Sequence, residues 1–422
     1  MSESANKQNF DLVIVGGGMV GSALGCAAAQ AGFEVCVVEA REPQSEWPAE
    51  EVDLRVSALS RASQRILENL GVWERMLELR VSPYSDMRVW DAGGDGRSWR
   101  PASPDTGTSL FGGSIHFSAA DIDEPNLGHI VENRVTQLAL WEQLGRLSNV
   151  TRLCPAEIDN LEIGDSPALS LKDGSRLPAR LIVGADGRES LVRRLASIGT
   201  QGWDYDQHAI VATVKPERHH QYTAWQRFMP TGPLAFLPLD DGRCSIVWST
   251  APALAEALMA MQNVPFCQAL TAASDGVLGE ILDAGPRGVF PLRLGHAETY
   301  IRQGLALVGD AAHAIHPLAG QGVNLGFLDA ATLIEVLIAA RDSGRNIGGI
   351  PTLRRYERAR KGANLGMLGA MDFFKRFFSN DVPPLKVARN LGLSLADHAG
   401  PVKHLIIKRA MGLTGERPAL AR

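Results

Sequence analysis

Cysteine is scarce in this chain and follows no pattern that would give it a structural role. The five cysteines in 422 residues are Cys26, Cys36, Cys154, Cys244 and Cys267. Their number is odd, and none forms a CxxC pair or a Cys/His spacing typical of a zinc site. We therefore expect neither disulfides nor a metal site, and we interpret the cysteines as small buried hydrophobic residues.

Long apolar runs are also missing. No run approaches the roughly 18 residues that a membrane-spanning helix needs, and residues 1–10 lack the charged-then-apolar pattern of a secretory signal. We expect a cytoplasmic protein. The composition, 45% hydrophobic and 21% charged, is typical of a folded globular protein. A chain this long exceeds the usual size of one core, which predicts two or more domains.

Acidic residues are few at the C-terminal end. Residues 354–422 hold fourteen Lys and Arg against five Asp and Glu, a local charge of +9 within a chain of net charge −5. Two segments gather these charges beside apolar residues, 373–376 and 403–409. The asymmetry indicates a surface for an anionic membrane or an acidic partner. A solvated helix face is the alternative interpretation, and it stays open.

The start of the chain carries a dinucleotide-binding pattern. An apolar strand at residues 11–15 is followed at once by a GxGxxG spacing formed by Gly16, Gly18 and Gly21. A small-residue helix and a second strand at residues 34–38 come next, and the second strand ends at Glu39. The glycines let a pyrophosphate approach the helix N-terminus, and the acid binds ribose hydroxyls. Because an acid disfavours a 2′-phosphate, the pattern predicts FAD or NAD rather than NADP.

A second stretch also joins a strand end to a glycine loop. Residues 305–308 form an apolar strand that leads into Gly309 and Asp310. Ligands bind at the carboxyl ends of strands in open α/β sheets, so Asp310 is placed to accept hydrogen bonds from a sugar or ribityl chain. The loop at residues 320–322 then precedes an apolar stripe of helical period, which predicts a helix from near Val323. Its N-terminus suits a group that becomes negative. An ordinary turn and a buried helix remain the alternative.

The rest of the sequence predicts four further features. Apolar periodicity indicates one helix over residues 62–79, and a turn at residues 172–175 indicates a hairpin. Alternating segments between residues 203 and 291 predict an antiparallel sheet. No second GxGxxG follows a strand, although a reductase with two Rossmann domains would need one for its nicotinamide. Residues 353–400 are predicted to be helical.

Three motifs occur in the order seen in class A FAD-dependent aromatic hydroxylases. They are GxGxxG with Glu39, GADGRESLVR, and VGDAAHAIHPLAGQGVNLG. Shorter matches are RVSA, GHIVEN, AFLPL, CSIVWS and HPLAGQGVNLGF. With them the chain resembles the ubiquinone-biosynthesis hydroxylases, and most of all the 2-polyprenylphenol hydroxylase branch, over nearly its whole length. Residues 91–126 are longer than that branch leads us to expect.

The resemblance implies an α/β fold with a Rossmann-like FAD-binding domain of the para-hydroxybenzoate hydroxylase type. An antiparallel-sheet substrate domain would be inserted into it, and a C-terminal helical region would follow. We expect the FAD-binding domain at residues 1–80, 127–195 and 286–352. The substrate domain would cover residues 81–126 and 196–285, and the helical region residues 353–422.

The resemblance also implies the residues around the cofactor. It places the FAD pyrophosphate at Gly16, Gly18 and Gly21, the adenosine ribose at Glu39 and the ribityl chain at Asp310. Further residues beside FAD would be Arg55, Asn133, Asp186 and Gly309. The pyrimidine end of the isoalloxazine would be held by Gly320, Gly322, Val323 and Asn324. For the substrate pocket we expect His316, Pro317, Phe236, Pro238 and Phe290.

The implied reaction hydroxylates the aromatic ring of a polyprenylated phenol. NAD(P)H reduces FAD, O₂ adds to give a flavin hydroperoxide, and one oxygen atom passes to the ring. No catalytic side chain is singled out. The candidates to assist phenol deprotonation are His129, His208, His313 and His316, and for each a structural histidine is the simpler interpretation.

Two other functions remain open from the sequence. An FAD-dependent isoprenoid reductase shares the fold and the lipid substrate. A flavin-bearing scaffold subunit of a quinone-biosynthesis complex would dock its partners through the basic C-terminal region, which is equally suited to peripheral contact with the inner face of a membrane. A halogenase is disfavoured because no two of the eight tryptophans lie two residues apart, as WxWxIP requires. We expect no nucleic-acid partner, and a homo-oligomer stays open.

Overall fold

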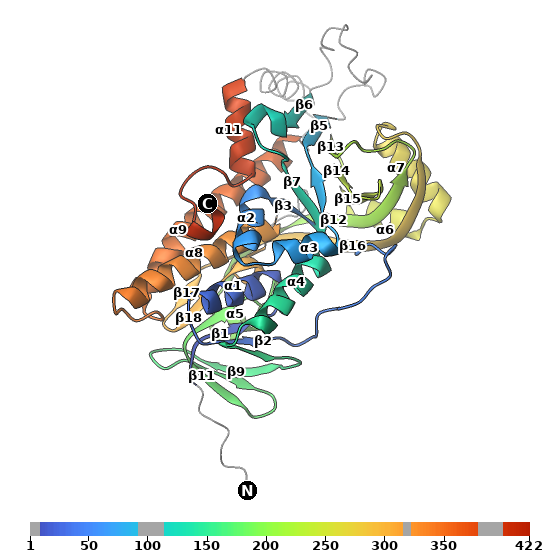
Figure 1. Ribbon diagram of the computed structural model, residues 1–422. Coiled ribbons are helices and arrows are strands. Elements are labelled where there is room, and N and C mark those ends of the chain that lie inside the picture. Colours follow the sequence, from blue (N-terminus) through green and yellow to red (C-terminus); the bar gives the residue numbers. More distant parts are fainter. Residues whose placement is uncertain (1–8, 92–113, 315–321, 379–399) are drawn as a thin grey trace.

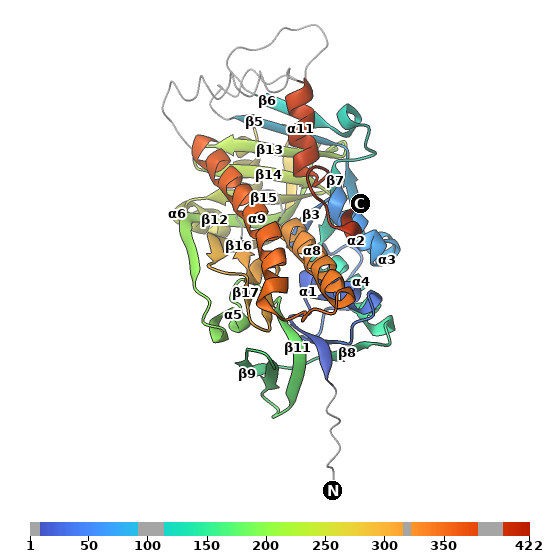
Figure 2. The same ribbon diagram turned by 90° about the vertical axis from the view of Figure 1, so that its left-hand side faces the viewer.

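The computed structural model describes residues 9–91, 114–314, 322–378 and 400–422. Two large sheets and a small one make up its β-structure, and long helices run along one side of them (Figures 1 and 2). The mixed α/β class predicted from the sequence is confirmed.

The first sheet is built around parallel strands. Its order is β17-β18-β11-β1-β2-β8, and β9 and β10 extend it beside β11. The predicted hairpin is confirmed, since β10 pairs antiparallel with β11. The strands are β1 (Phe10–Val15), β2 (Val35–Val38), β8 (Val150–Leu153), β9 (Ile158–Glu162), β10 (Ala168–Leu171), β11 (Arg176–Gly184), β17 (Ile301–Arg302) and β18 (Leu305–Leu307).

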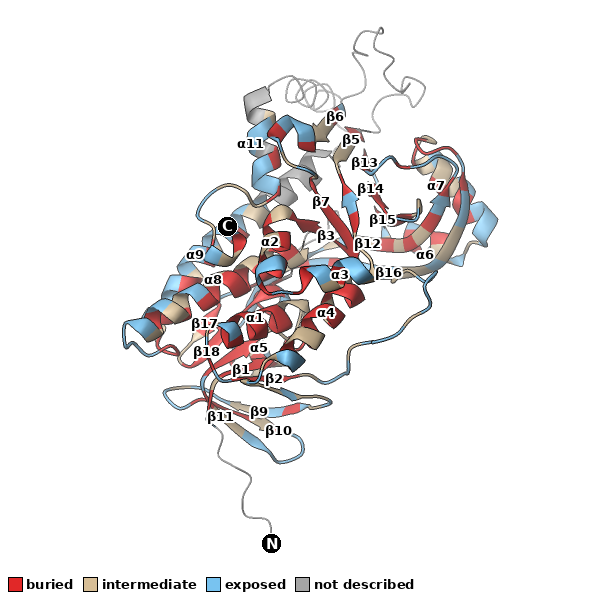
Figure 3. Cartoon of the chain, in the orientation of Figure 1, coloured by how far each residue is buried: buried red, intermediate tan, exposed pale blue. Residues whose placement is uncertain are grey.

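The parallel strands are apolar in sequence because they lie inside the main apolar core. Every residue of β2 and β18 is buried, as the red strands of Figure 3 show. The helices around this sheet are α1 (Met19–Gln30), α4 (Asn133–Arg146), α5 (Leu191–Leu195) and α8 (Gly322–Asp342).

Helix α8 confirms the helix that was predicted to start near Val323. It is long and apolar enough to cross a membrane by length and composition, and 61% of its apolar window is buried inside the structure. It packs against α1 and α9 (Ile350–Phe378), and it carries the fully buried Asp329. We therefore interpret α8 as a core helix.

The second sheet confirms the predicted antiparallel layer. Its order is β19-β16-β12-β15-β14-β13-β5-β6. Helices α6 (Pro252–Ala260) and α7 (Asn263–Ala273) cover one face with a separate apolar core. The strands are β5 (Asp86–Asp91), β6 (Ser114–Ser118), β12 (Thr200–Pro216), β13 (Thr223–Met229), β14 (Gly232–Pro238), β15 (Cys244–Thr250), β16 (Ile281–Ala297) and β19 (His313–Ala314).

A three-stranded sheet lies beside the other two. It consists of β3 (Val56–Ser60), β7 (Gly128–Glu132) and β4 (Ser82–Tyr84). The single helix predicted over residues 62–79 is wrong, because the chain forms α2 (Arg61–Asn69) and α3 (Trp73–Leu79). Gly71 separates them with a φ of +74°, a left-handed conformation that ends a helix.

Two of the expected domain boundaries cut through paired strands. Residue 286 falls inside β16, which pairs along its length with β12. The boundary between residues 126 and 127 separates β4 from β7, its partner in the small sheet. Strand pairing with residues distant in sequence overrides both boundaries. At the C-terminal end, α11 (Gly400–Ala410) follows α9 among the described helices.

Candidate functional site

The first glycine loop joins β1 to α1 and leaves the helix N-terminus open. Gly16 has a φ of +105°, and a Cβ there would lie 2.5 Å from the Ala185 carbonyl oxygen. A Cβ on Gly21 would lie 1.9 Å from the Gly16 carbonyl oxygen. Gly18 is the N-cap of α1 without a side-chain cap, and its Cβ would meet nothing within 4 Å. The helix therefore presents unsatisfied N–H groups to open space, an arrangement that suits a phosphate.

Glu39 lies at the carboxyl end of β2 beside this loop. Its carboxylate accepts a hydrogen bond from the Gly17 N–H at 2.6 Å and one from the Arg41 N–H at 3.0 Å. Each oxygen keeps a further lone pair for a ligand hydroxyl. The carboxylate is thus fixed next to the glycine turn, as recognition of the adenosine ribose requires.

The second motif meets the first at the same edge of the sheet. Gly309, with a φ of +59°, directly follows the β18 segment. Cβ atoms built on Gly309 and Gly326 would lie 3.2 Å and 2.5 Å from the methyl groups of Val20 in the first turn of α1. The end of β18 and the start of α8 thus pack against the start of α1, and Asp310 is exposed beside them.

Asp186 makes its hydrogen bonds within its own motif. It accepts hydrogen bonds from the Ser190 hydroxyl at 2.5 Å and from the N–H groups of Leu191 at 2.7 Å and Val192 at 3.0 Å. Its carboxylate therefore stabilises the start of α5. Arg193 of the same motif donates to the Ala311 carbonyl oxygen at 2.9 Å, so the motif supports the turn that carries Asp310.

Arg55 and Asn133 lie together at the edge of the small sheet. The Asn133 N–H donates to the Arg55 carbonyl oxygen at 2.9 Å, and the Asn133 side chain accepts from the Ser57 hydroxyl at 2.7 Å. The Arg55 side chain is exposed and is available to a ligand phosphate.

At the start of α8, some residues have free space beside them and others are held by hydrogen bonds within the protein. No atom of the described residues lies within 4 Å of a Cβ on Gly322, and Val323 is partly exposed. The buried Asn324 side chain accepts from the Ser60 N–H at 2.9 Å and the Ser63 hydroxyl at 2.7 Å. It also donates to a carbonyl oxygen of β3 at 2.8 Å, so it fastens α8 to β3 and α2. Three expected residues lie outside the described part of the chain: Gly320, His316 and Pro317.

The candidate pocket residues on the second sheet lie on opposite faces. Phe236 is 1% exposed and packs in the core under α6 and α7, so its assignment to the pocket wall is wrong. Pro238, two residues on, shares that face and is wrong for the same reason, since side chains alternate along a strand. The open face carries Ala235, which with Leu237 and Tyr84 lines a small cavity of about 10 Å³.

Phe290 lies on the open face. Cross-strand pairs align Ala235 with Val247, Val247 with Val211, and Val211 with Gly288, two residues before Phe290. Phe290 is 39% exposed. An apolar wall therefore extends from β14 to β16 on the side of the sheet that is free of α6 and α7.

No described histidine stands out as a base. Burial and the nearby charge of Arg61 lower the pKa of His129 to about 4, and its ring packs edge-on against Trp73 at 4.9 Å. His208 is partly exposed on β12, and His313 is buried against Asp329. The described residues contain no group of three or more His, Cys, Asp and Glu side chains able to hold a metal.

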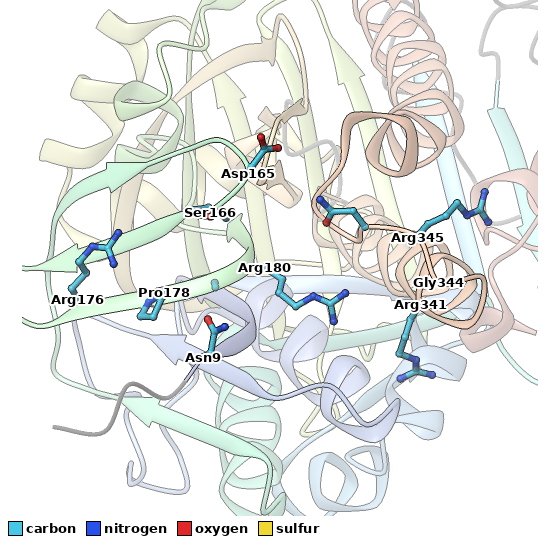
Figure 4. A pocket seen from close by; sticks show the side chains of 12 residues that line it. Asn9, Asp165, Ser166, Arg176, Pro178, Arg180, Arg341, Gly344 and Arg345 are labelled. Carbon is cyan, nitrogen blue, oxygen red and sulfur yellow. The ribbon is translucent and has the colours of Figure 1, made fainter. Parts of the chain in front are cut away.

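A cavity of about 560 Å³ opens at the other edge of the first sheet, where β1 and β11 begin and α8 ends. Figure 4 shows arginines on two of its sides: Arg176 and Arg180 belong to β11, Arg341 lies at the end of α8, and Arg345 follows α8. Arg176 and Arg180 are paired with carboxylates of β9 and β1. The glycine loops lie at the opposite ends of these strands, so this cavity does not belong to the nucleotide site.

The donor set at the carboxyl edge fits FAD: an open helix N-terminus, a fixed carboxylate for the ribose and an exposed carboxylate beside a second helix N-terminus. The sequence model described as "FAD binding domain" matches residues 9–142 and 162–363. The chain belongs to this FAD binding domain family. The expected FAD cofactor is thereby supported by the family and by the site.

Members of the FAD binding domain family with assigned activities are similar over nearly the whole chain. The 3-demethoxyubiquinol 3-hydroxylase of Escherichia coli is 41% identical over 407 residues, which cover 96% of this chain and 99% of the relative. The ubiquinone hydroxylase UbiL of Rhodospirillum rubrum is 40% identical over 416 residues, 98% and 92% of the two chains. The human ubiquinone biosynthesis monooxygenase COQ6 is 34% identical over 455 aligned positions, 94% and 92%. The resemblance to the ubiquinone-biosynthesis hydroxylases is confirmed.

Solved structures show the same fold. The p-nitrophenol 4-monooxygenase PnpA of Pseudomonas putida has a TM-score of 0.74 at 19% identity, covering 97% of this chain and 99% of that one. PqsL of Pseudomonas aeruginosa has a TM-score of 0.73 at 21% identity, covering 92% and 100%. At such identities the likeness concerns the fold alone.

Proposed function

We propose that this protein is an FAD-dependent monooxygenase that hydroxylates the aromatic ring of a polyprenylated phenol in ubiquinone biosynthesis, using NAD(P)H and O₂. The observation that carries the proposal is the full-length similarity to relatives named for that pathway, 41% and 40% identical. The meeting of both glycine motifs at one edge of the first sheet supports it. These relatives favour the hydroxylase over an isoprenoid reductase or a scaffold subunit.

Bound FAD would supply the activation of O₂, and the chain supplies binding, orientation and electrostatics. The N-terminus of α1 would hold the pyrophosphate, with Glu39 on the adenosine ribose and Asp310 on the ribityl chain. Helix α8 begins at Gly322, and its dipole would stabilise negative charge at the flavin ring. The apolar wall that includes Ala235 and Phe290 would exclude water from the phenol ring.

The proposal is tested by deleting the gene and analysing quinone intermediates by mass spectrometry. We expect a prenylated phenol lacking one ring oxygen to accumulate, and the wild-type gene to restore the product. A Gly322→Asp variant should fail to restore it, because the new carboxylate lies where negative charge is to be stabilised. Restoration by Gly322→Asp, with no consumption of O₂ by the purified protein, would favour the scaffold instead.

We also propose that α11 contacts an anionic membrane surface, which would give access to a substrate with a long apolar tail. Lys403 is not available for this contact, since it pairs with Asp121 at 3.1 Å and fixes α11 to the protein body. Leu405 is 59% exposed, and Lys408 and Arg409 are exposed beyond it. An exposed apolar side chain beside cations is typical of interfacial helices. The side chains of residues 373–376 lie outside the described ones.

Flotation with anionic liposomes tests the membrane contact. The double variant Lys408→Glu, Arg409→Glu should lose binding that the wild type shows, and the loss should shrink as salt screens the wild type. The matched control reverses two exposed cations far from α11, Lys172 in the β10–β11 turn and Arg345 after α8. Equal binding by the α11 variant and the wild type would contradict the proposal.

A further inference from the structure

The middle of α8 carries a carboxylate that is removed from solvent and saturated with donors. Asp329 is 0% exposed. One of its oxygens accepts from the Gly309 N–H at 3.1 Å and from His313 Nε2 at 2.5 Å. The other accepts from Arg360 Nε at 2.7 Å and from Asn364 Nδ2 at 3.1 Å. Four donors therefore converge on a single side chain in the core.

The ionised state of Asp329 is secured by these donors. Burial alone would raise its pKa, but the charges and hydrogen bonds of His313 and Arg360 outweigh burial and lower the pKa to about 2. Arg360 is itself held by Asn364 Oδ1 at 2.8 Å and is 7% exposed. A buried carboxylate is costly unless it is paired and hydrogen-bonded, and here both conditions are met.

The donors belong to the elements that frame the flavin side of the site. Gly309 precedes Asp310 at the end of β18, and His313 lies on β19, the edge strand of the second sheet. Asp329 itself is seven residues into α8 from Gly322, about 10 Å along the helix at 1.5 Å per residue. Arg360 and Asn364 bring in α9. One carboxylate thus ties the Asp310 turn, the second sheet and α9 to the helix whose N-terminus faces the cofactor edge.

We infer that Asp329 is a positioning residue for the flavin half of FAD: it sets the placement of the Asp310 turn relative to the start of α8 without touching the cofactor. The inference rests on the FAD-dependent function proposed above. The adenosine half is held by the β1–α1 loop and Glu39, which share no hydrogen bond with Asp329 among the described residues. Loss of the carboxylate should therefore weaken one half of the site and spare the other.

The test compares FAD with ADP as ligands of the apoprotein by titration calorimetry. For Asp329→Asn we expect the affinity for FAD to fall about tenfold or more, because a charged hydrogen bond is lost from the turn. The affinity for ADP, which reaches only the adenosine and pyrophosphate part, should stay at the wild-type value. The matched control is Asp342→Asn, an exposed carboxylate on the same helix, and it should change neither affinity.

Because Asp329→Asn leaves Arg360 buried without its anion, that variant is at risk of misfolding. His313→Leu removes a single donor and provides a milder second test with the same expected split between FAD and ADP. Unchanged FAD affinity in the folded variants, or an equal fall for FAD and ADP, would overturn the positioning role. A wild-type apoprotein that binds ADP but not FAD would instead overturn the proposed function.

Discussion

At the scale of single residues, the glycines of the site are required for two different reasons. Gly16 and Gly21 are needed because a Cβ would overlap backbone atoms of the protein itself. Among the described residues, no atom lies within 4 Å of a Cβ on Gly18 or Gly322, so a side chain there would conflict with a bound ligand and not with these residues. The sequence pattern shows four glycines alike, and only the structure separates the two kinds.

Gly18 therefore allows a variant that folds but does not bind the cofactor. Its φ of −69° suits any residue, and Asp is a favourable N-cap. We expect Gly18→Asp to unfold at a midpoint no lower than that of the wild type while losing FAD, because its charge repels the pyrophosphate. Gly18→Asn has the same size without the charge and should retain more FAD. The measurements are the flavin absorbance of the purified proteins and thermal unfolding of the apoproteins.

The motifs predict the site residues along the chain but could not show the hydrogen bonds each one makes. Asp186 and Asn324 both belong to flavin motifs, yet their side chains are used within the protein. Asn324 bonds to Ser60, 264 positions away, and no local pattern reports such a partner. Asp329 was missed altogether, although an acidic residue inside the apolar stripe of a helix was the available signal.

At the scale of elements, hydrophobic periodicity predicted whether a segment is a helix or a strand better than it predicted where one helix ends and the next begins. The apolar period runs from α2 into α3 without interruption, which hides the break at Gly71. In β14 both faces are apolar because both are buried. The sequence could therefore not show whether Ala235 or Phe236 faces the open side.

Replacing glycine by alanine should change the free energy of unfolding in opposite directions at the break between α2 and α3 and inside α9. Gly71→Ala should lower the free energy of unfolding by about 1 kcal/mol, since a Cβ is unfavourable at positive φ. Gly362→Ala, at an exposed position inside α9 with free space around it, should raise it by roughly 0.5–1 kcal/mol. Urea unfolding of both variants measures the difference. Shifts of the same sign would show that the helix break is misplaced.

At the scale of the whole molecule, the two glycine motifs and the antiparallel layer were predictable because each depends on local spacing. The order of strands was not, since pairing joins distant segments. The expected boundaries after residue 126 and at residue 286 divide paired strands for this reason: β4 pairs with β7, and β16 pairs with β12. The division into cofactor, substrate and helical regions stays a prediction that limited proteolysis would test.

The pairing of the 17-residue strands β12 and β16 connects two parts of the proposed site. The β12–β16 ladder begins at the pair Thr200–Ala297 and continues to Pro216, while the end of β16 also pairs with β19 next to His313. The proposed substrate wall and β19, which follows the Asp310 turn, are thus joined through the β12–β16 ladder, whose register shifts at three places. We therefore expect a substrate with an isoprenoid tail to reach this wall without separation of β12 from β16.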